Sequence, residues 1–320
     1  MRPSSLLRTI SSKLPARFSP PPVAPWPPVR TAFDDFLISE LDNLRQSTHS
    51  LTSSSWLCSA LDIAITAQRM SPMSLLPCAI EIEKKSVEKY YKDSADLLDA
   101  CNCLRERIYV IRSYLRNSES ALRWLEFTDD VELSSSLFRK ALYALECCED
   151  DERQIVELEK MKKKFDYCCA PKELVAEPEA LIGAGVVAMF VVGVFDGVFS
   201  FKGHRRLMEL SLECERLPWM HALNEVCKQV KDEVEKRRKG GSVVLDELRE
   251  LVLVVKALRE LVCFIVEKGK ECGREMKKVM DLVRRRCGEL KEMMEVLEGR
   301  VDELYKELIG VRMVFLERFA

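Results

Sequence analysis

Motifs of the common enzyme classes are missing from this sequence. It has no Walker-type glycine-rich loop, no G-x-G-x-x-G after a strand, no G-x-S-x-G and no H-E-x-x-H. Only three histidines occur among 320 residues, so few side chains could serve as a conventional general base. Carboxylates are plentiful but fall at the spacing of polar helix faces. The sequence therefore predicts no catalytic residue and no cofactor, and we expect a protein that is not an enzyme.

A large excess of charge of either sign is missing as well. The 50 basic and 52 acidic side chains leave a formal net charge of -2, so no bulk field would recruit nucleic acid. The basic runs at 160–164 and 236–239 lack interleaved aromatic residues. We interpret both runs as solvated helix faces and expect no nucleic-acid partner.

Proline is scarce outside the first 28 residues, which hold eight of the 13 in the chain. The remaining 292 residues contain few helix breakers, and no segment alternates apolar and polar residues in the manner of a strand bounded by turns. With 47% hydrophobic and 32% charged residues the chain can bury a core. These features predict an all-α fold, a multi-helix bundle.

Residues 1–30 differ from the rest of the chain. They contain basic residues, five serines and many prolines, and no acid occurs before Asp34. This composition is typical of a transit peptide for a chloroplast or mitochondrion. A disordered proline-rich leader that binds partners in extended form fits equally well.

The 13 cysteines do not resemble a disulfide scaffold or a metal site. Their number is odd, no C-x-x-C occurs, and no histidine brackets a cysteine pair at zinc spacing. We expect reduced, packed thiols and no metal. The rival hypothesis is a soluble small-molecule carrier or enzyme that uses Cys101 and Cys103 in an apolar pocket of the bundle. We also interpret His221, next to Pro218 and Trp219, as a packing residue.

An N-terminal helical region is expected over 31–170. Thr31 is a suitable N-cap with Asp34 three residues later, and an apolar face follows at Phe33, Phe36, Leu37, Leu41 and Leu44. Further helices are predicted at 55–69, 78–126, 131–147 and 151–168.

The C-terminal region, 207–320, carries two heptad seams. The first follows Val244, Leu248, Leu251, Val255, Leu258, Val262 and Ile265. The second follows Met276, Met280, Val283, Cys287, Leu290, Met294, Leu297, Val301, Leu304, Leu308, Val311 and Phe315. The seams differ in phase and are separated by Gly269 and Gly273, which predicts a helical hairpin. A seam alone does not distinguish packing within a bundle, which we favour, from a homodimeric coiled coil. Asp281–Arg285 and Asp302–Lys306 are expected as ion pairs on the solvated face.

Between these regions, 171–206 contains an apolar glycine- and valine-rich segment. Ala180 to Phe201 is 22 residues long with a single charge, at Asp196. We predict a membrane anchor formed by Leu181, Ile182, Val186, Val187, Phe190, Val191, Val192, Val194, Phe195, Val198 and Phe199. Acids precede the segment and bases follow it, which would leave the C-terminal part in the cytosol or stroma, with single-pass or peripheral membrane attachment. The alternative is the buried central helix of the bundle.

One short segment carries a family resemblance. The residues Tyr91-Lys92-Asp93-Ser94, followed by Leu97-Leu98-Asp99-Ala100-Cys101-Asn102, resemble a segment of the plant BYPASS-related proteins. The order of parts is also similar: an aromatic-containing helix, a long helix, a valine- and glycine-rich middle and a heptad-bearing C-terminus, over about 31–317. The matching residues are Tyr91, Asp93, Ser94, Leu97, Leu98, Asp99, Cys101 and Asn102.

The resemblance implies a non-enzymatic plant regulatory or scaffold protein acting in growth and development. It implies restraint of a root-derived mobile signal and protein partners in the secretion machinery, including the exocyst. Together with the apolar segment it predicts a membrane-associated helical protein that works by protein–protein contacts. No catalytic residue is carried over.

Overall fold

The computed structural model describes residues 30–72, 84–126, 134–161, 179–199, 217–238, 245–268 and 273–319. The chain divides into two units, Met1–Arg30 and Thr31–Ala320, and all described helices belong to the second. The predictions for the leader, as a transit peptide or a disordered segment, lie outside the described residues.

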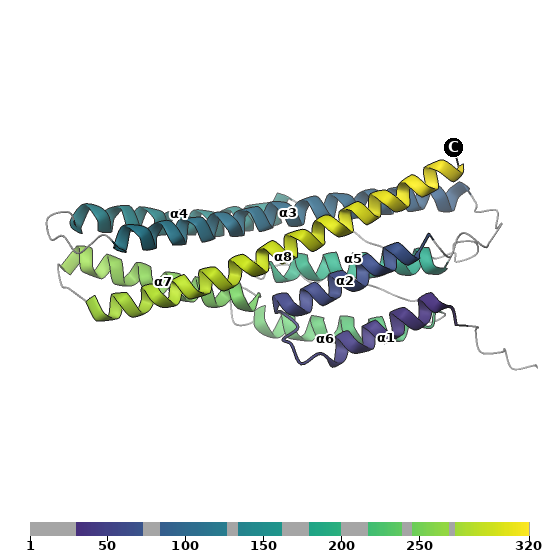
Figure 1. The fold of residues 1–320 in the computed structure, drawn as a ribbon, viewed down its shortest axis with the longest axis horizontal. Coiled ribbons are helices and arrows are strands. Elements are labelled where there is room, and N and C mark those ends of the chain that lie inside the picture. Colours follow the sequence, from purple (N-terminus) through teal and green to yellow (C-terminus); the bar gives the residue numbers. More distant parts are fainter. Residues whose placement is uncertain are drawn as a thin grey trace, which may run out of the picture. The chain divides into compact units, whose positions relative to one another are not determined.

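The described residues form eight helices and short turns and contain no strand, which confirms the all-α multi-helix bundle (Figure 1). Its helices are α1 (Ala32–Gln46), α2 (Ser54–Met70), α3 (Lys84–Glu126), α4 (Ser134–Met161), α5 (Glu179–Val198), α6 (Met220–Arg238), α7 (Asp246–Lys268) and α8 (Gly273–Phe319).

The start of α1 shows the expected capping box. The Asp34 backbone N–H donates to Thr31 Oγ1 at 3.1 Å, and the Thr31 backbone N–H donates to Asp34 Oδ2 at 2.9 Å. Two otherwise unpaired donors at the helix end are satisfied in this way. The predicted apolar face follows, with Phe33, Leu37 and Leu41 buried against the bundle.

The predicted bounds of α2 and the predicted end of α3 agree with the structure, whereas the predicted start of α3 at residue 78 lies outside the described residues. The prediction for α4 is wrong. Helices predicted at 131–147 and 151–168 are one continuous helix, Ser134–Met161, and residues 131–133 and 162–168 lie outside the described part. The intervening residues include no proline or glycine. Because Cys148, Asp151 and Ile155 are buried at helical spacing, the core-facing side continues through the predicted break.

The predicted C-terminal hairpin is present as two separate helices, α7 and α8, which pack against each other. All twelve positions of the second seam, from Met276 to Phe315, are buried. In the first seam the positions from Leu248 to Val262 are buried and Ile265 is partly buried, whereas Val244 lies outside the described residues.

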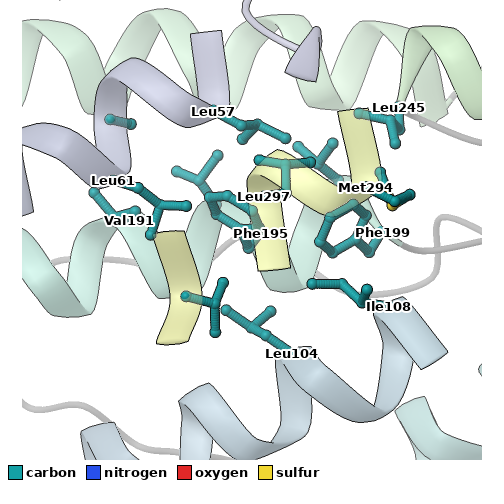
Figure 2. Packing of buried hydrophobic residues seen from close by; sticks show 14 of the residues in the cluster. Leu57, Leu61, Leu104, Ile108, Val191, Phe195, Phe199, Leu245, Met294 and Leu297 are labelled. Atoms are coloured by element: carbon teal, nitrogen blue, oxygen red, sulfur yellow. The ribbon is translucent and has the colours of Figure 1, made fainter. Parts of the chain in front are cut away.

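The seam of α8 is buried within its own chain. α8 packs against α2, α3 and α7, while α5 packs against α2, α3 and α6. Figure 2 shows Leu61 of α2, Leu104 of α3, Phe195 of α5 and Leu297 of α8 converging on one apolar core. The seam is therefore occupied inside the bundle, and a coiled coil between chains cannot use it.

Candidate functional site

Ten of the eleven predicted anchor residues lie on α5, and Phe199 directly follows its last residue. Ten of the eleven are buried and Ile182 is partly buried, all within the bundle core or a small satellite cluster in which Leu181 contacts Val311 and Phe315. Within the described residues α5 is the one helix long and apolar enough to cross a membrane, with a mean hydropathy of 2.2 over Ala180–Val198. Because 78% of the apolar window is buried by the bundle, the same hydropathy also suits a core helix.

A close approach of α1 fixes the first turns of α5. A Cβ on Gly183 would lie 2.5 Å from Phe33 Cε1 and 3.3 Å from Trp219 Cζ2. Since real Cβ contacts are not that short, only glycine fits between Phe33 and Trp219 without a shift. Gly183 therefore sets how closely α1, α5 and the start of α6 pack.

Two polar side chains hold α5 at opposite ends. Gln68 of α2 donates from Nε2 to the Ala184 carbonyl oxygen at 3.0 Å, a buried hydrogen bond. Arg107 of α3 donates from Nη1 to the Asp196 carbonyl oxygen at 2.9 Å, and its Nη2 lies 2.6 Å from Asp196 Oδ1. These bonds fix the position of α5 along its axis relative to α2 and α3. Apolar contacts alone are not directional and would allow the helix to shift along its neighbours.

Arg107 of α3 carries a positive charge in the core of the bundle. None of its side chain is exposed, whereas the Asp196 side chain retains 30% of its exposure. A buried guanidinium requires a counter-charge, because the loss of hydration costs several kcal/mol per ion in proteins. Asp196, which the sequence presents only as an interruption of the apolar segment, supplies that charge.

A polar junction joins the end of α5 to the starts of α2 and α7. The Leu245 backbone N–H donates to the Val198 carbonyl oxygen at 3.2 Å, and the Asp246 N–H donates to the Thr52 carbonyl oxygen at 3.2 Å. The Asp246 carboxylate accepts from Thr52 Oγ1 at 3.1 Å and from Arg249 Nη2 at 2.9 Å, and it is paired with Arg237.

The environment of Asp246 shifts its pKa. Burial alone would raise the pKa, but hydrogen bonds from Ser50, Arg237 and Thr52 and the charge of Arg237 outweigh it, so the pKa lies below its usual value. Asp246 is therefore held in its charged form as part of the fold.

The segment that resembles the BYPASS-related proteins lies on the first half of α3 and packs against the end of α8. Ser94, Leu97 and Cys101 are buried, Tyr91, Asp93 and Leu98 are partly buried, and Asp99 and Asn102 are exposed. Arg312 of α8 donates from Nη1 to the Tyr91 carbonyl oxygen at 2.8 Å and to Ser94 Oγ at 2.6 Å. Its guanidinium also lies 5.1 Å from the Tyr91 ring centroid.

Ion pairs extend the contact between α3 and α8, which run antiparallel. Arg105 Nε lies 2.7 Å from Asp302 Oδ1, and Arg112 Nη2 lies 2.6 Å from Glu298 Oε2. The expected Asp302–Lys306 pair is thus wrong, because Arg105 of α3 takes the Asp302 carboxylate. Asp281 likewise pairs with Arg284 at 2.7 Å in place of Arg285. Asp302, which the sequence predicts on the solvated face of α8, instead binds α3.

The candidate thiols are embedded in the core. Cys101 is fully buried, and burial raises its pKa to about 12 despite the nearby Arg105 charge. Burial has the same effect on Cys148, Cys227 and Cys287, whose pKa values rise to about 12. Such thiols stay protonated near neutral pH and are poor nucleophiles. Cys103 is half-buried.

Among the described residues no group of three or more histidine, cysteine and acidic side chains is placed to hold a metal ion. The interpretation of His221 as a packing residue is wrong, because its side chain is exposed at the start of α6. Trp219, two residues earlier, is the buried side chain there.

Comparison with known proteins adds no relative: no family model, no curated protein and no solved structure matches the chain. The site residues are thus interpreted from their own geometry and from the resemblance of the α3 segment. Sequence reasoning missed Arg107, Gln68 and Arg312. Their partners lie 89, 116 and 221 residues away, and no local spacing signals such contacts.

Proposed function

We propose that this chain is a non-enzymatic helical scaffold that acts through protein–protein contacts on the surface of its bundle, with α5 as the core helix. The observation that carries this proposal is the enclosure of α5, whose apolar side chains are buried and whose one charge, at Asp196, is matched by the buried Arg107.

The surfaces that face α5 support the proposal. If α5 alone moved into lipid, Leu61 of α2 and Leu104 of α3, which lie beside it in Figure 2, would lose part of their cover. Exposing a side chain of this kind costs about 1.5–3 kcal/mol. The Arg107 guanidinium would also lose its counter-charge. Both effects favour the helix staying in the bundle.

The partner class follows from the resemblance of the α3 segment to the BYPASS-related proteins. It supports a role in plant growth and development, through restraint of a root-derived mobile signal, and contact with the secretion machinery. Half of the segment docks α8 through Arg312, and this leaves Asp99 and Asn102 on the exposed side of α3. We propose that a partner contacts this exposed side.

Binding of the purified full chain to purified exocyst complex tests the partner assignment. We expect co-elution of the two, and weaker binding by an Asp99→Arg/Asn102→Arg variant that keeps the wild-type melting temperature. Glu157→Arg, at an exposed position of α4, is the matched control. Absence of binding by the wild-type chain would contradict the assignment.

A second candidate is attachment to a membrane through α5, and its hydropathy of 2.2 over 19 residues favours it. Carbonate extraction of membranes from plant cells separates the two roles. A core helix predicts release of the full chain into the soluble fraction, whereas an anchor predicts retention.

The Asp196→Leu variant makes this test sharper. Because it removes the charge from the apolar segment, an anchor should be retained at least as firmly. In the core role the same change leaves Arg107 buried without its counter-charge, so the variant should lose stability and accumulate less.

A further inference from the structure

The outer face of α8 carries three glycines that no described part of the chain packs against. Gly288, Gly299 and Gly310 are spaced by 11 residues, which is close to three turns, so they lie in line along one face. This face is opposite the buried seam. A Cβ built on any of them meets no atom of the described chain within 4 Å. Glycine inside a helix is unfavourable relative to alanine, so the single chain gains nothing from them.

Among the described residues nothing covers this face, and it is partly apolar. Figure 1 shows α8 running diagonally from α7 to the first half of α3, and its Gly288, Gly299 and Gly310 are all exposed. Val296 and Met313, which flank the line of glycines, are 53% and 50% exposed. Small residues between larger apolar ones allow a second helix to approach its backbone closely.

Charges on this face are complementary to those of a second, antiparallel α8. Glu292 and Lys306 are both exposed, and they are separated by about 21 Å at 1.5 Å per residue, too far to pair within one helix. In an antiparallel pair related by a two-fold axis at Gly299, Glu292 meets the partner's Lys306, and Gly288 meets the partner's Gly310. Symmetry forms each contact twice.

The neighbouring charges agree with this arrangement. Glu317 falls between the partner's Lys277 and Arg285, while the Asp281 that lies opposite it is neutralised by its own Arg284. A parallel, in-register pair would instead place Glu292 against Glu292 and Lys306 against Lys306. Like charges therefore disfavour the parallel arrangement.

We infer that the outer face of α8 binds a second copy of this chain, with the two α8 helices antiparallel and the two-fold axis at Gly299. The inference rests on the proposed function, since it names a partner for one surface of the scaffold. It differs from a coiled coil built on the heptad seam, because the seam is occupied within the bundle.

Light scattering after size-exclusion chromatography of the full chain, from about 1 to about 100 µM, tests the inference. We expect a dimer that dissociates on dilution. Glu292→Lys or Lys306→Glu alone should weaken the dimer by about tenfold or more, because each creates two like-charge contacts, and the double reversal should restore it. Glu260→Lys, at an exposed position of α7, makes the same charge change elsewhere and should have no effect.

The variant Gly299→Gln distinguishes an effect on the close approach of the two α8 helices from an effect on the folding stability of the monomer. The site is open in the single chain and glutamine is a better helix former, so the melting temperature of the monomer should rise while the dimer weakens. Four results would each overturn the inference. The wild type could be a monomer at about 100 µM, or the single charge reversals could leave the dimer unchanged. The double reversal could fail to restore the dimer, or the Gly299→Gln dimer could be as tight as the wild type. Exocyst binding by the monomeric Glu292→Lys variant would show that the proposed function stands without it.

Discussion

The fully buried guanidinium of Arg107 on α3 lies 2.6 Å from the carboxylate of Asp196 on α5. The pair joins α5, the most apolar of the described helices, to α3, which carries the segment that resembles the BYPASS-related proteins. Since the Arg107 side chain is enclosed and the Asp196 side chain is partly exposed, the two partners depend on each other unequally.

This inequality predicts different costs for the two single substitutions. Asp196→Leu leaves a buried charge without its partner and should lower the free energy of unfolding by about 3–5 kcal/mol. Arg107→Leu leaves a carboxylate that water can reach, so its cost should be smaller. Urea unfolding measures both.

The double variant Arg107→Leu/Asp196→Leu provides the control. It should recover most of the loss, because an apolar pair can replace a buried ion pair at little cost. Equal costs for both single variants, or additive costs in the double variant, would contradict the unequal dependence of the two side chains.

A second prediction concerns the contact between α1 and α5. Gly183→Ala places a Cβ 2.5 Å from Phe33 Cε1, and the resulting shift should lower the free energy of unfolding by about 1–3 kcal/mol. Gly185→Ala, two residues later in the same helix, is the matched control. Its Cβ meets no described atom within 4 Å, so it should stabilise the protein by about 1 kcal/mol. The same sign for both variants, measured by thermal unfolding, would disprove the close approach.

A third prediction is a pH dependence from the junction at Asp246. Its pKa is lowered in the folded chain, so its contribution to stability is complete above the ordinary value of 3.8. The contribution is lost as the pH falls through the lowered value. The stability difference between the wild type and Asp246→Asn should therefore shrink as urea unfolding is repeated at decreasing pH below about 5.

Asp151 offers a comparison of opposite sign. Burial raises its pKa in the folded chain, although a 2.8 Å hydrogen bond from Asn117 opposes the rise. Its charged form is thus disfavoured in the folded state, and stability falls as the pH rises from the ordinary value through the raised one. Asp151→Asn should gain stability relative to the wild type over that interval. A parallel trend for the two variants would contradict both assignments.

A fourth prediction concerns thiol reactivity. With pKa values of about 12 and little exposure, Cys101, Cys148 and Cys287 should resist iodoacetamide in the native protein at mildly alkaline pH. Mass spectrometry after proteolysis identifies the modified residues, and the same treatment in urea should label all three. Rapid native labelling of Cys101 would instead support the hypothesis of a carrier or enzyme that uses its thiol.

The local features of this protein were predictable because they depend on neighbours within a few residues. The capping box at Thr31 needs only the spacing to Asp34, and the twelve seam positions of α8 follow from helical periodicity. The same reasoning failed at α4, where two helices were predicted, at 131–147 and 151–168, in place of the one helix Ser134–Met161. The buried spacing of Cys148 and Asp151 instead carries the helix through.

By itself, the sequence determined the helical class, the apolar stripe of each main helix and the length of the apolar segment, since all three are periodic or compositional properties. Only the tertiary structure decided what those stripes face. It placed the α8 seam inside its own chain, enclosed α5, and matched Asp196 with an arginine 89 residues away. Contacts between distant residues depend on how all helices pack at once, so they leave no trace in the spacing along one helix.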